Sequence, residues 1–451
     1  MDRRVGVASP GLQGSPASPE SRRPSLLRAV EVFANRDFRY LWVSSLFSFV
    51  GMQMQMIAGA WLAWELTHSF ALVGVISVAM GLPMLLLSLV GGAMADRLNK
   101  RNLSIITQAV IFATAVATAL LIVTDLISIE LLFAIGLVQG VSFAFGMPAR
   151  QPLIAVAVGP EQLMSAMALS NAAMNGTRLV GPAIAGGLIA AQGVESSYFV
   201  QAVLFVISSV LLLLVPAKLG AAAGQVRTSI VREIGHGLRY VAGDRTLRML
   251  LLMAFIPALF AMPYQVLLSG FVERDLGQGP EAFGLLQTVT GVGAVVGSVA
   301  MAWAIDFPRK PMLQLISGVL VGLGLVALGL GAMRWGYPGA VVAVLFIGLT
   351  LTSYQTLNMT MIMAAAAREY YGRVMSMMML TFSVMPLMAA PLGLLADRIG
   401  AMYLFIAQGA IVAGLLALVS LMNPRYSFGR TGESHAAGRS SEPLADAAGD
   451  G

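Results

Sequence analysis

The chain contains no cysteine, and its three histidines, His68, His236 and His435, are far apart in the sequence. The lack of thiols excludes disulfide bonds and thiolate metal sites, and scattered histidines indicate no metal cluster. An enzyme working inside a membrane would need a nucleophile with its base, or a metal set, within the apolar segments. Those segments contain no histidine and no pair of carboxylates. We therefore predict that the protein is not an enzyme and has no cofactor.

Charged residues are also scarce. Asp, Glu, Lys and Arg make up 11% of the 451 residues, against about a quarter in soluble domains, and the mean hydropathy is +0.80. Apolar runs at 103–124, 197–215 and 402–422 each have about 20 residues, the length of helix that crosses a bilayer core. The sequence therefore predicts a protein with several transmembrane helices.

Twelve spans are predicted between two polar tails. Residues 1–35 lack the apolar segment of a signal peptide, and they and 423–451 are expected to be disordered cytoplasmic tails. Six spans form a predicted bundle at 36–215 and six form another at 247–422. The connection 216–246 contains SIVREIGHGLRYV, whose apolar spacing predicts an amphipathic helix at the membrane surface. The predicted spans are 39–65, 71–94, 103–124, 128–148, 164–190, 196–215, 247–271, 282–305, 312–333, 338–362, 374–396 and 402–422.

The basic residues are distributed unevenly among the loops. If the N-terminus is cytoplasmic, only Arg274, Arg334 and Arg398 of the 28 Lys and Arg residues fall in outer loops. Arg178 falls within a span, and the other 24, among them Arg150, lie in the tails and the inner loops. Because positive charge accumulates on the cytoplasmic side, both termini are predicted to be cytoplasmic. Contact with anionic lipid also accounts for the net charge of +6, so no nucleic-acid partner is expected.

The two predicted bundles resemble each other in sequence. At an offset of 210 residues, ALVGVISVAMGLPMLLLSLVGGAMADRLNKR aligns without gaps with 281–311, and Asp96 aligns with Asp306. Two shorter pairs have nearly the same offset, namely 36–41 with 245–250 and 163–169 with 374–380. Three matches in the same place of each half indicate a duplication. The predicted fold is an all-α polytopic membrane protein of two six-helix bundles with the same orientation.

The loop GGAMADRLNKR at 91–101, between the second and third spans, carries the most specific motif. It lacks the G-x-x-x-x-G-K-[ST] pattern of an ATP-binding loop, and its acid would repel phosphate. It resembles instead the signature G-x-x-x-D-R-x-G-R-K/R of the major facilitator superfamily, secondary transporters with two parallel six-helix halves. Asn99 replaces the usual glycine, which we attribute to its tolerance of left-handed backbone. The matching residues are Gly92, Asp96, Arg97, Lys100 and Arg101.

This resemblance implies that the loop is a latch between the two halves. In that role Asp96 would face the positive N-terminal end of span 11 near Arg373. A charged turn that only anchors two helices at the lipid headgroups is the alternative interpretation. The expected gating residues are Gly92, Asp96, Arg97, Lys100, Arg101, Asp306 and Arg373.

The tripeptide Ala-Asp-Arg of this loop recurs in GLLADRIG at 393–400. That second segment ends span 11 and is predicted to lie on the opposite side of the membrane. The repeat aligns the loop with AMAWAIDFPRK at 300–310 instead. We therefore attribute the recurrence to local similarity.

Three further segments resemble one branch of the superfamily, the bacterial drug and siderophore exporters that include the enterobactin exporter. They are NRDFRYLW at the start of span 1, MPARQ at 147–151 after span 4, and REYYGRVMS at 368–376 before span 11. The resemblance implies export from the cell.

Arg178 is the basic residue predicted to lie near the middle of a span. Placing arginine there costs about 2.5–3.5 kcal/mol or more, and no Asp or Glu lies well inside any predicted span to pair with it. One interpretation is structural, with the guanidinium satisfied by carbonyls near Gly181 and Pro182. The other is a role in binding or gating, for which an acidic or phenolate-bearing substrate is expected.

The resemblance also implies that spans 1, 4, 7 and 10 surround a central binding site. Amides within membrane helices commonly bond neighbouring helices, so a structural role is the alternative for each of them. Together with several methionines they predict an adaptable, partly apolar pocket. The expected substrate-binding residues are Arg178, Gln53, Gln55, Gln139, Tyr264, Gln265, Tyr354, Gln355 and Asn358.

These observations together predict a secondary active transporter in the bacterial cytoplasmic (inner) membrane that works by alternating access. The expected action is export of a small amphipathic or anionic compound, a drug or siderophore-like molecule, with protons as the coupling ion. A span-4 signature of the superfamily has arginine where this chain has Gly136, so the proton pathway is not given by the sequence. An uptake carrier or a lipid or lysolipid flippase is the alternative. Membrane lipid is an expected partner, and the protein is expected to be a monomer.

Overall fold

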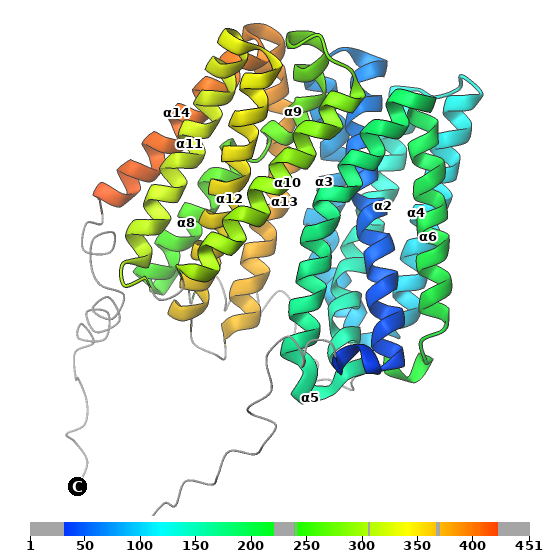
Figure 1. Cartoon of the computed structure of the whole chain (residues 1–451). Coiled ribbons are helices and arrows are strands. Elements are labelled where there is room, and N and C mark those ends of the chain that lie inside the picture. Colours follow the sequence, from blue (N-terminus) through cyan, green and yellow to red (C-terminus); the bar gives the residue numbers. More distant parts are fainter. Residues whose placement is uncertain (1–30, 221–238, 240, 305–306, 367–369, 423–451) are drawn as a thin grey trace, which may run out of the picture.

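The computed structural model describes residues 31–220, 239, 241–304, 307–366 and 370–422 (Figure 1). Every regular element in these ranges is a helix. A few side chains within α3 and α13, including those of Asp96 and Arg373, lie outside the description. So do the predicted tails, most of the predicted amphipathic connection, and Asp306.

The helices form two bundles that stand side by side in Figure 1, as predicted. The first contains α2 (Arg36–Thr67), α3 (Phe70–Arg97), α4 (Lys100–Val123), α5 (Ile129–Gln192) and α6 (Val194–Leu213), with the short η2 (Val32–Ala34) and η3 (Ala217–Gly220). The second contains α8 (Arg245–Phe260), α9 (Tyr264–Gly270), η4 (Phe271–Asp275), α10 (Pro280–Trp303), α11 (Lys310–Trp335), α12 (Tyr337–Ala365), α13 (Tyr371–Ile399) and α14 (Ala401–Leu421).

Ten helical segments in the described residues are long and apolar enough to cross a membrane. Element α5 consists of two helices that meet at a kink at Gly159, whose φ of 73° departs from helical geometry. It therefore covers the two predicted spans 128–148 and 164–190. The part of α5 after Gly159 and helix α13 are not among the ten, so the number of twelve spans stays a prediction.

Polar caps and glycines determine where the helices begin and end. The Asn35 side chain accepts hydrogen bonds from the backbone N–H groups of Asp37 and Phe38, which stabilises the start of α2. At the end of the molecule that is predicted to lie outside the cell, which we call the outer end, single glycines join consecutive helices. Gly193, Gly336 and Gly400 have φ of 88°, 61° and 88°, a conformation that side chains disfavour. The outer turns at these three places are therefore very short.

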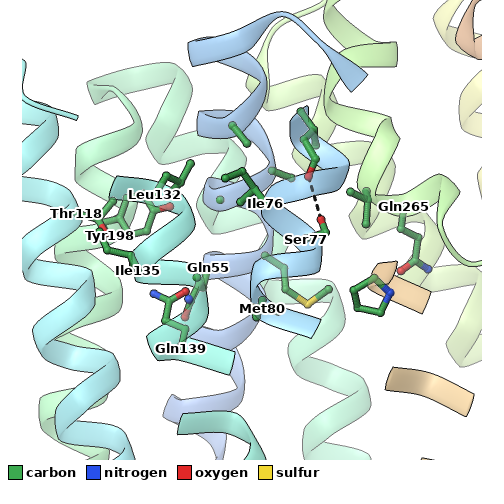
Figure 2. A pocket seen from close by; sticks show the side chains of 18 of the residues that line it. Gln55, Ile76, Ser77, Met80, Thr118, Leu132, Ile135, Gln139, Tyr198 and Gln265 are labelled. Atoms are coloured by element: carbon green, nitrogen blue, oxygen red, sulfur yellow. Dashed lines mark hydrogen bonds between the residues drawn. The ribbon is translucent and has the colours of Figure 1, made fainter. Parts of the chain in front are cut away.

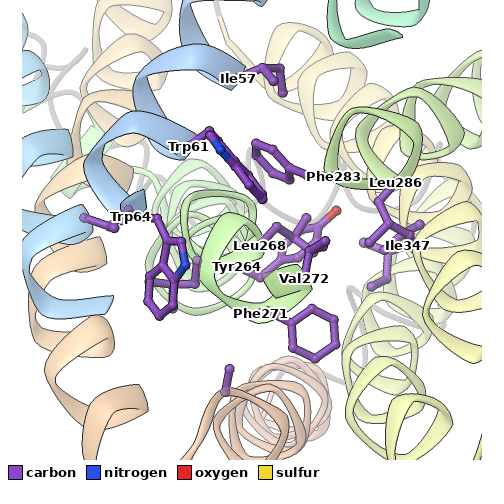
Figure 3. Packing of buried hydrophobic residues seen from close by; sticks show 14 of the residues in the cluster. Ile57, Trp61, Trp64, Tyr264, Leu268, Phe271, Val272, Phe283, Leu286 and Ile347 are labelled. Carbon is purple, nitrogen blue, oxygen red and sulfur yellow. The ribbon is translucent and has the colours of Figure 1, made fainter. Parts of the chain in front are cut away.

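Two helix pairs make the most extensive contacts between the bundles. Helix α3 packs along α13, and α5 packs along α10. At the outer end an apolar core spans both bundles (Figure 3). There, the ring of Trp61 on α2 stacks on Phe283 of α10, across the two bundles, with ring centroids 6.0 Å apart. Within the first bundle, the rings of Trp64 and Phe70 have centroids 4.8 Å apart. The bundles are thus held together by apolar packing at their outer ends.

Candidate functional site

A cavity of about 270 Å³ lies between the two bundles, on the inner side of this apolar core. Figure 2 shows side chains from α2, α3, α4, α5 and α6 on one side of it and Gln265 of α9 on the other. Because both bundles line the cavity, their relative movement would change its shape and its access. The lining residues are Gln55, Met56, Gly59, Ala60, Ala63, Val73, Ile76, Ser77, Met80, Thr118, Leu132, Ile135, Gly136, Gln139, Tyr198, Gln265, Val266, Phe283, Gln287, Met385 and Pro386.

Four glutamines provide most of the polar groups of this wall. The side-chain oxygen of Gln55 accepts a hydrogen bond from Gln201 Nε2 at 2.7 Å, and Gln139 Nε2 donates to Thr114 Oγ1 at 3.2 Å. Gln287 Nε2 donates to the backbone oxygen of Gln265 at 3.4 Å. These neighbours orient the amides of Gln55, Gln139 and Gln287, and each of the three retains further donor or acceptor capacity.

None of the described residues around the cavity carries a formal charge at neutral pH. The phenol of Tyr198 is the ionisable side chain among them. Most of the remaining wall is aliphatic, aromatic or methionine side chain. Such a wall suits a molecule with apolar surface and a few neutral hydrogen-bonding groups.

The predicted substrate-binding residues fall into two groups. Gln55, Gln139 and Gln265 line the cavity. The other six do not, and three of these are buried in contacts between helices of the second bundle. Tyr354 Oη donates to the carbonyl oxygen of Met253 at 2.6 Å and Asn358 Nδ2 donates to that of Leu250 at 3.1 Å, while Tyr264 lies in the apolar core. The half-buried Gln53 packs its Cβ beside Gly181, and Gln355 Nε2 lies 3.8 Å from Met262 Sδ.

Arg178 lies on α5 where this helix packs against α10. A Cβ added to Gly291 of α10 would lie 3.0 Å from the carbonyl oxygen of Arg178, so the two backbones are close. The Arg178 side chain is exposed, and within the described part of the chain it makes no hydrogen bond or ion pair. The guanidinium therefore remains available to a ligand or to solvent, although it does not line the cavity.

The described part of the 91–101 loop has a structural role. Arg101 donates from Nε to the Leu212 carbonyl at 3.0 Å and from Nη2 to that of Leu213 at 2.7 Å, so it caps the C-terminal end of α6. Asn99 is the N-cap of α4 and has φ of −66°, so our attribution to left-handed backbone was wrong. The Lys100 side chain is buried and that of Arg97 is exposed. The contacts of Gly92, Asp96, Asp306 and Arg373 lie outside the described residues.

Arg150 is a half-buried cation that the sequence did not reveal. The charge count placed it in an inner loop, but α5 continues through this position to Gly159. Its Nη2 donates to Ser48 Oγ of α2 at 2.8 Å, and Ser48 Oγ in turn lies 2.6 Å from Ser208 Oγ of α6.

Sequence reasoning also missed Ser77 and Gln287, which line the cavity, because their spans were not expected to face the site. Their polarity within apolar runs was the available signal.

Comparison with known proteins agrees with this architecture. The family described as "Transmembrane secretion effector" matches residues 29–446. The staphyloferrin A transporter of Staphylococcus aureus (strain NCTC 8325 / PS 47) is 23% identical and aligns over 82% of this chain and 92% of its own length. The multidrug efflux pump Tap of Mycobacterium tuberculosis (strain ATCC 25618 / H37Rv) is 27% identical and aligns over 83% of this chain and 91% of its own.

A solved structure shows the same fold. A bacterial homologue of the iron transporter ferroportin, in an inward-facing state, superposes with a TM-score of 0.67 at 16% identity. The superposition covers 85% of this chain and 98% of the ferroportin homologue. With the family match extending over both bundles, the chain belongs to the transmembrane secretion effector family of major facilitator transporters.

Proposed function

We propose that the protein exports small amphipathic compounds by alternating access, with the cavity between the bundles as the binding site. The observation that carries this proposal is the composition of the cavity wall, which is largely apolar, has four glutamine amides and has no formal charge among its described residues. Sugars and inorganic ions would need more polar partners than this wall supplies. The name of one similar protein, the multidrug efflux pump Tap, supports export over uptake.

Proton antiport is the coupling that we propose for this export, by analogy with other major facilitator transporters. The described wall of the cavity contains no carboxylate. Glu65, near the outer end of α2, has an exposed side chain and lies away from the cavity wall. Under this proposal the proton binds outside the cavity, and coupling passes through the movement of the bundles.

Filling the cavity is expected to reduce export strongly. In Figure 2 the Ser77 side chain lies among the labelled residues that line the cavity, and its described hydrogen bond is to the Val73 carbonyl of its own helix. Ser77→Phe should therefore occupy the cavity without removing a contact between helices. Export of an uncharged amphipathic dye, such as Nile red, should fall by about tenfold or more in inside-out vesicles with an acidic lumen.

Two controls complete this experiment. Ser77→Ala, which adds no volume, should export at the rate of the unmodified protein. Nigericin, which dissipates the proton gradient, should stop export by the unmodified protein if coupling is to protons. Undiminished dye export by Ser77→Phe would show that the substrate uses another route.

Arg178 is expected to add selectivity for anions. Its exposed guanidinium lies at the contact of α5 with α10 and has no partner among the described residues, so an acidic group of a substrate could pair with it. Arg178→Gln should raise the KM for an anionic amphipathic compound several-fold, which corresponds to a loss of about 1 kcal/mol of binding free energy. The KM for a neutral compound should not change. Equal effects on both compounds would indicate a structural role for Arg178.

A further inference from the structure

The outer end of the molecule contains a polar contact between the bundles that the proposed binding site does not use. Asp397 lies in the last turn of α13, which ends at Ile399. Its Oδ2 accepts hydrogen bonds from Ser69 Oγ at 2.7 Å and from the backbone N–H of Ala71 at 2.9 Å, and its Oδ1 accepts one from the N–H of Phe70 at 2.9 Å. One carboxylate of the second bundle thus caps the start of α3 in the first.

The position of Asp397 is unfavourable within its own helix. An acid in the last turn of a helix lies beside the negative end of the helix dipole, whereas an acid at the first turn lies beside the positive end. Asp397 is at the wrong end of α13 and at the right end of α3. Its location is therefore explained by the contact between bundles, and not by the stability of α13.

The hydrogen bonds to α3 carry this contact more than the nearby ion pair does. Arg274 Nη1 lies 3.7 Å from Asp397 Oδ1, and the Arg274 side chain is 46% exposed. Exposed pairs at this distance contribute about 1 kcal/mol or less. Bonds from backbone N–H groups to a carboxylate are charge-assisted and shorter, and about twice as strong as neutral ones.

Below the carboxylate, α3 and α13 are packed backbone against backbone. A Cβ on Gly393 would meet the Phe70 carbonyl, and a Cβ on Gly74 would meet the Ala389 carbonyl. A Cβ on Gly81 would lie 2.5 Å from Pro386 Cβ. This close packing runs from the outer end to the cavity, where Pro386 is part of the wall. Opening the cavity to the outside requires the two helices to part along this line.

The same tripeptide ends both of these antiparallel helices. Ala95-Asp96-Arg97 ends α3 and Ala396-Asp397-Arg398 is in the last turn of α13. The Asp397 tripeptide lies beside the start of α3 at the outer end, whereas α3 itself ends at the opposite, inner end of the molecule. The recurrence that we attributed to local similarity thus has a structural meaning at the outer end.

We propose that Asp397, bound to Ser69, Phe70 and Ala71, is an outer latch that stabilises the state of the transporter that is closed to the outside. It is a positioning residue for transport, because it acts on the α3–α13 contact and does not touch the cavity. The inner and outer acids of the two tripeptides would be engaged in alternation. The proposal rests on the proposed alternating access, and it does not depend on the substrate or the direction of transport.

The test measures the opening of each end directly. The chain has no native cysteine, so pairs of spin labels can be attached to introduced cysteines without removing others. Exposed positions suit this purpose: Leu126 and Trp335 report the outer end, and Met164 and Met422 report the inner end. Electron–electron distance measurements on full-length protein in lipid nanodiscs then give the populations of open and closed states.

Asp397→Asn removes the negative charge and replaces one accepting oxygen by an amide NH₂ group, which cannot accept the hydrogen bonds that Ser69, Phe70 and Ala71 donate. We expect it to raise the ratio of outer-open to outer-closed molecules by about tenfold, with the inner pair becoming closer. Ser69→Ala, which removes one of the three bonds, should change the ratio in the same direction and by less. Arg398→Gln, the matched control on the same turn, should leave the ratio unchanged.

Gly74→Leu distinguishes failure of the latch from failure of alternating access. Its side chain collides with the Ala389 carbonyl in the outer-closed state and should open the outer pair whether or not Asp397 acts as a latch. If Gly74→Leu opens the outer end while Asp397→Asn and Ser69→Ala do not, the latch is overturned and alternating access stands. If no variant moves either pair, both proposals are overturned. Should Asp397→Asn fail to fold, Ser69→Ala alone decides.

Discussion

Replacing Gly409 by alanine is expected to destabilise the second bundle, because two of its helices meet backbone to backbone at this residue. Gly409 on α14 and Gly322 on α11 face each other, and a Cβ on either would meet the carbonyl oxygen of the other. A Cβ on Gly409 would also lie 2.7 Å from the backbone N of Val326. Backbone atoms cannot move aside as the end of a flexible side chain can, so α11 and α14 must separate.

The expected cost of Gly409→Ala is about 1–3 kcal/mol, as for other overpacked cores. It should appear as a lower melting temperature and a lower yield of monodisperse protein in detergent. Gly414→Ala is the matched control, because Gly414 is on the same helix and has no atom of another element within 4 Å. The control should be as stable as the unmodified protein or slightly more stable, since alanine favours helix. Equal melting temperatures for the two variants would contradict this account of the interface.

Replacing Gly186 by valine is expected to reduce transport while leaving both bundles folded. A Cβ on Gly186 of α5 would lie 2.9 Å from Gly284 Cα and 2.9 Å from the Pro280 carbonyl oxygen, both on α10. The contact is reciprocal, since a Cβ added to Gly284 would lie 2.8 Å from Gly186 Cα. This contact is between the bundles. A larger residue therefore opposes their approach at the outer end without disturbing the packing inside either one.

We expect Gly186→Val to lower the rate of dye export by about tenfold, equivalent to 1.4 kcal/mol against the closed state, with little change in melting temperature. Gly187→Val, at the next position, is the control because no atom of another described element lies within 4 Å of its added Cβ. Its rate should match that of the unmodified protein. A parallel loss of melting temperature and transport in Gly186→Val would instead place the defect within a bundle.

Much of the fold follows from the sequence, because apolar runs and their separators specify helices directly. Each predicted span coincides with a helix or part of one, except 247–271, which is divided between α8, α9 and the start of η4. The extent of the first helix of α5 was not predicted, since the apolar residues after Arg150 allow this helix to continue to Gly159, beyond the predicted end of the span at 148. For the same reason Arg150 was assigned to a loop. Hydropathy records where a helix can lie in lipid, and it does not record where the helix ends.

The candidate site was less accessible to sequence reasoning. Gln55, Gln139 and Gln265 were expected near a central cavity and line one. Tyr354 and Asn358 had the same polarity and the same kind of position, but they bond carbonyl groups of α8. A buried polar side chain that satisfies a neighbouring helix has the same sequence signature as one that awaits a ligand. Only the packing of neighbouring helices distinguishes them.

The uncharged wall of the cavity has a consequence for the membrane potential. Under the proposed alternating access, switching the cavity between the two sides would move little protein charge through the membrane field, because no described lining side chain carries a formal charge. The charge moved in each cycle is then that of the substrate and the coupling ion. Exchange of a neutral compound for one proton would move one charge, worth about 2.3 kcal/mol per 100 mV, whereas exchange of a monovalent cation for one proton would be electroneutral. The transport rate of the same protein would thus depend on the membrane potential with a neutral substrate and be independent of it with a monovalent cation.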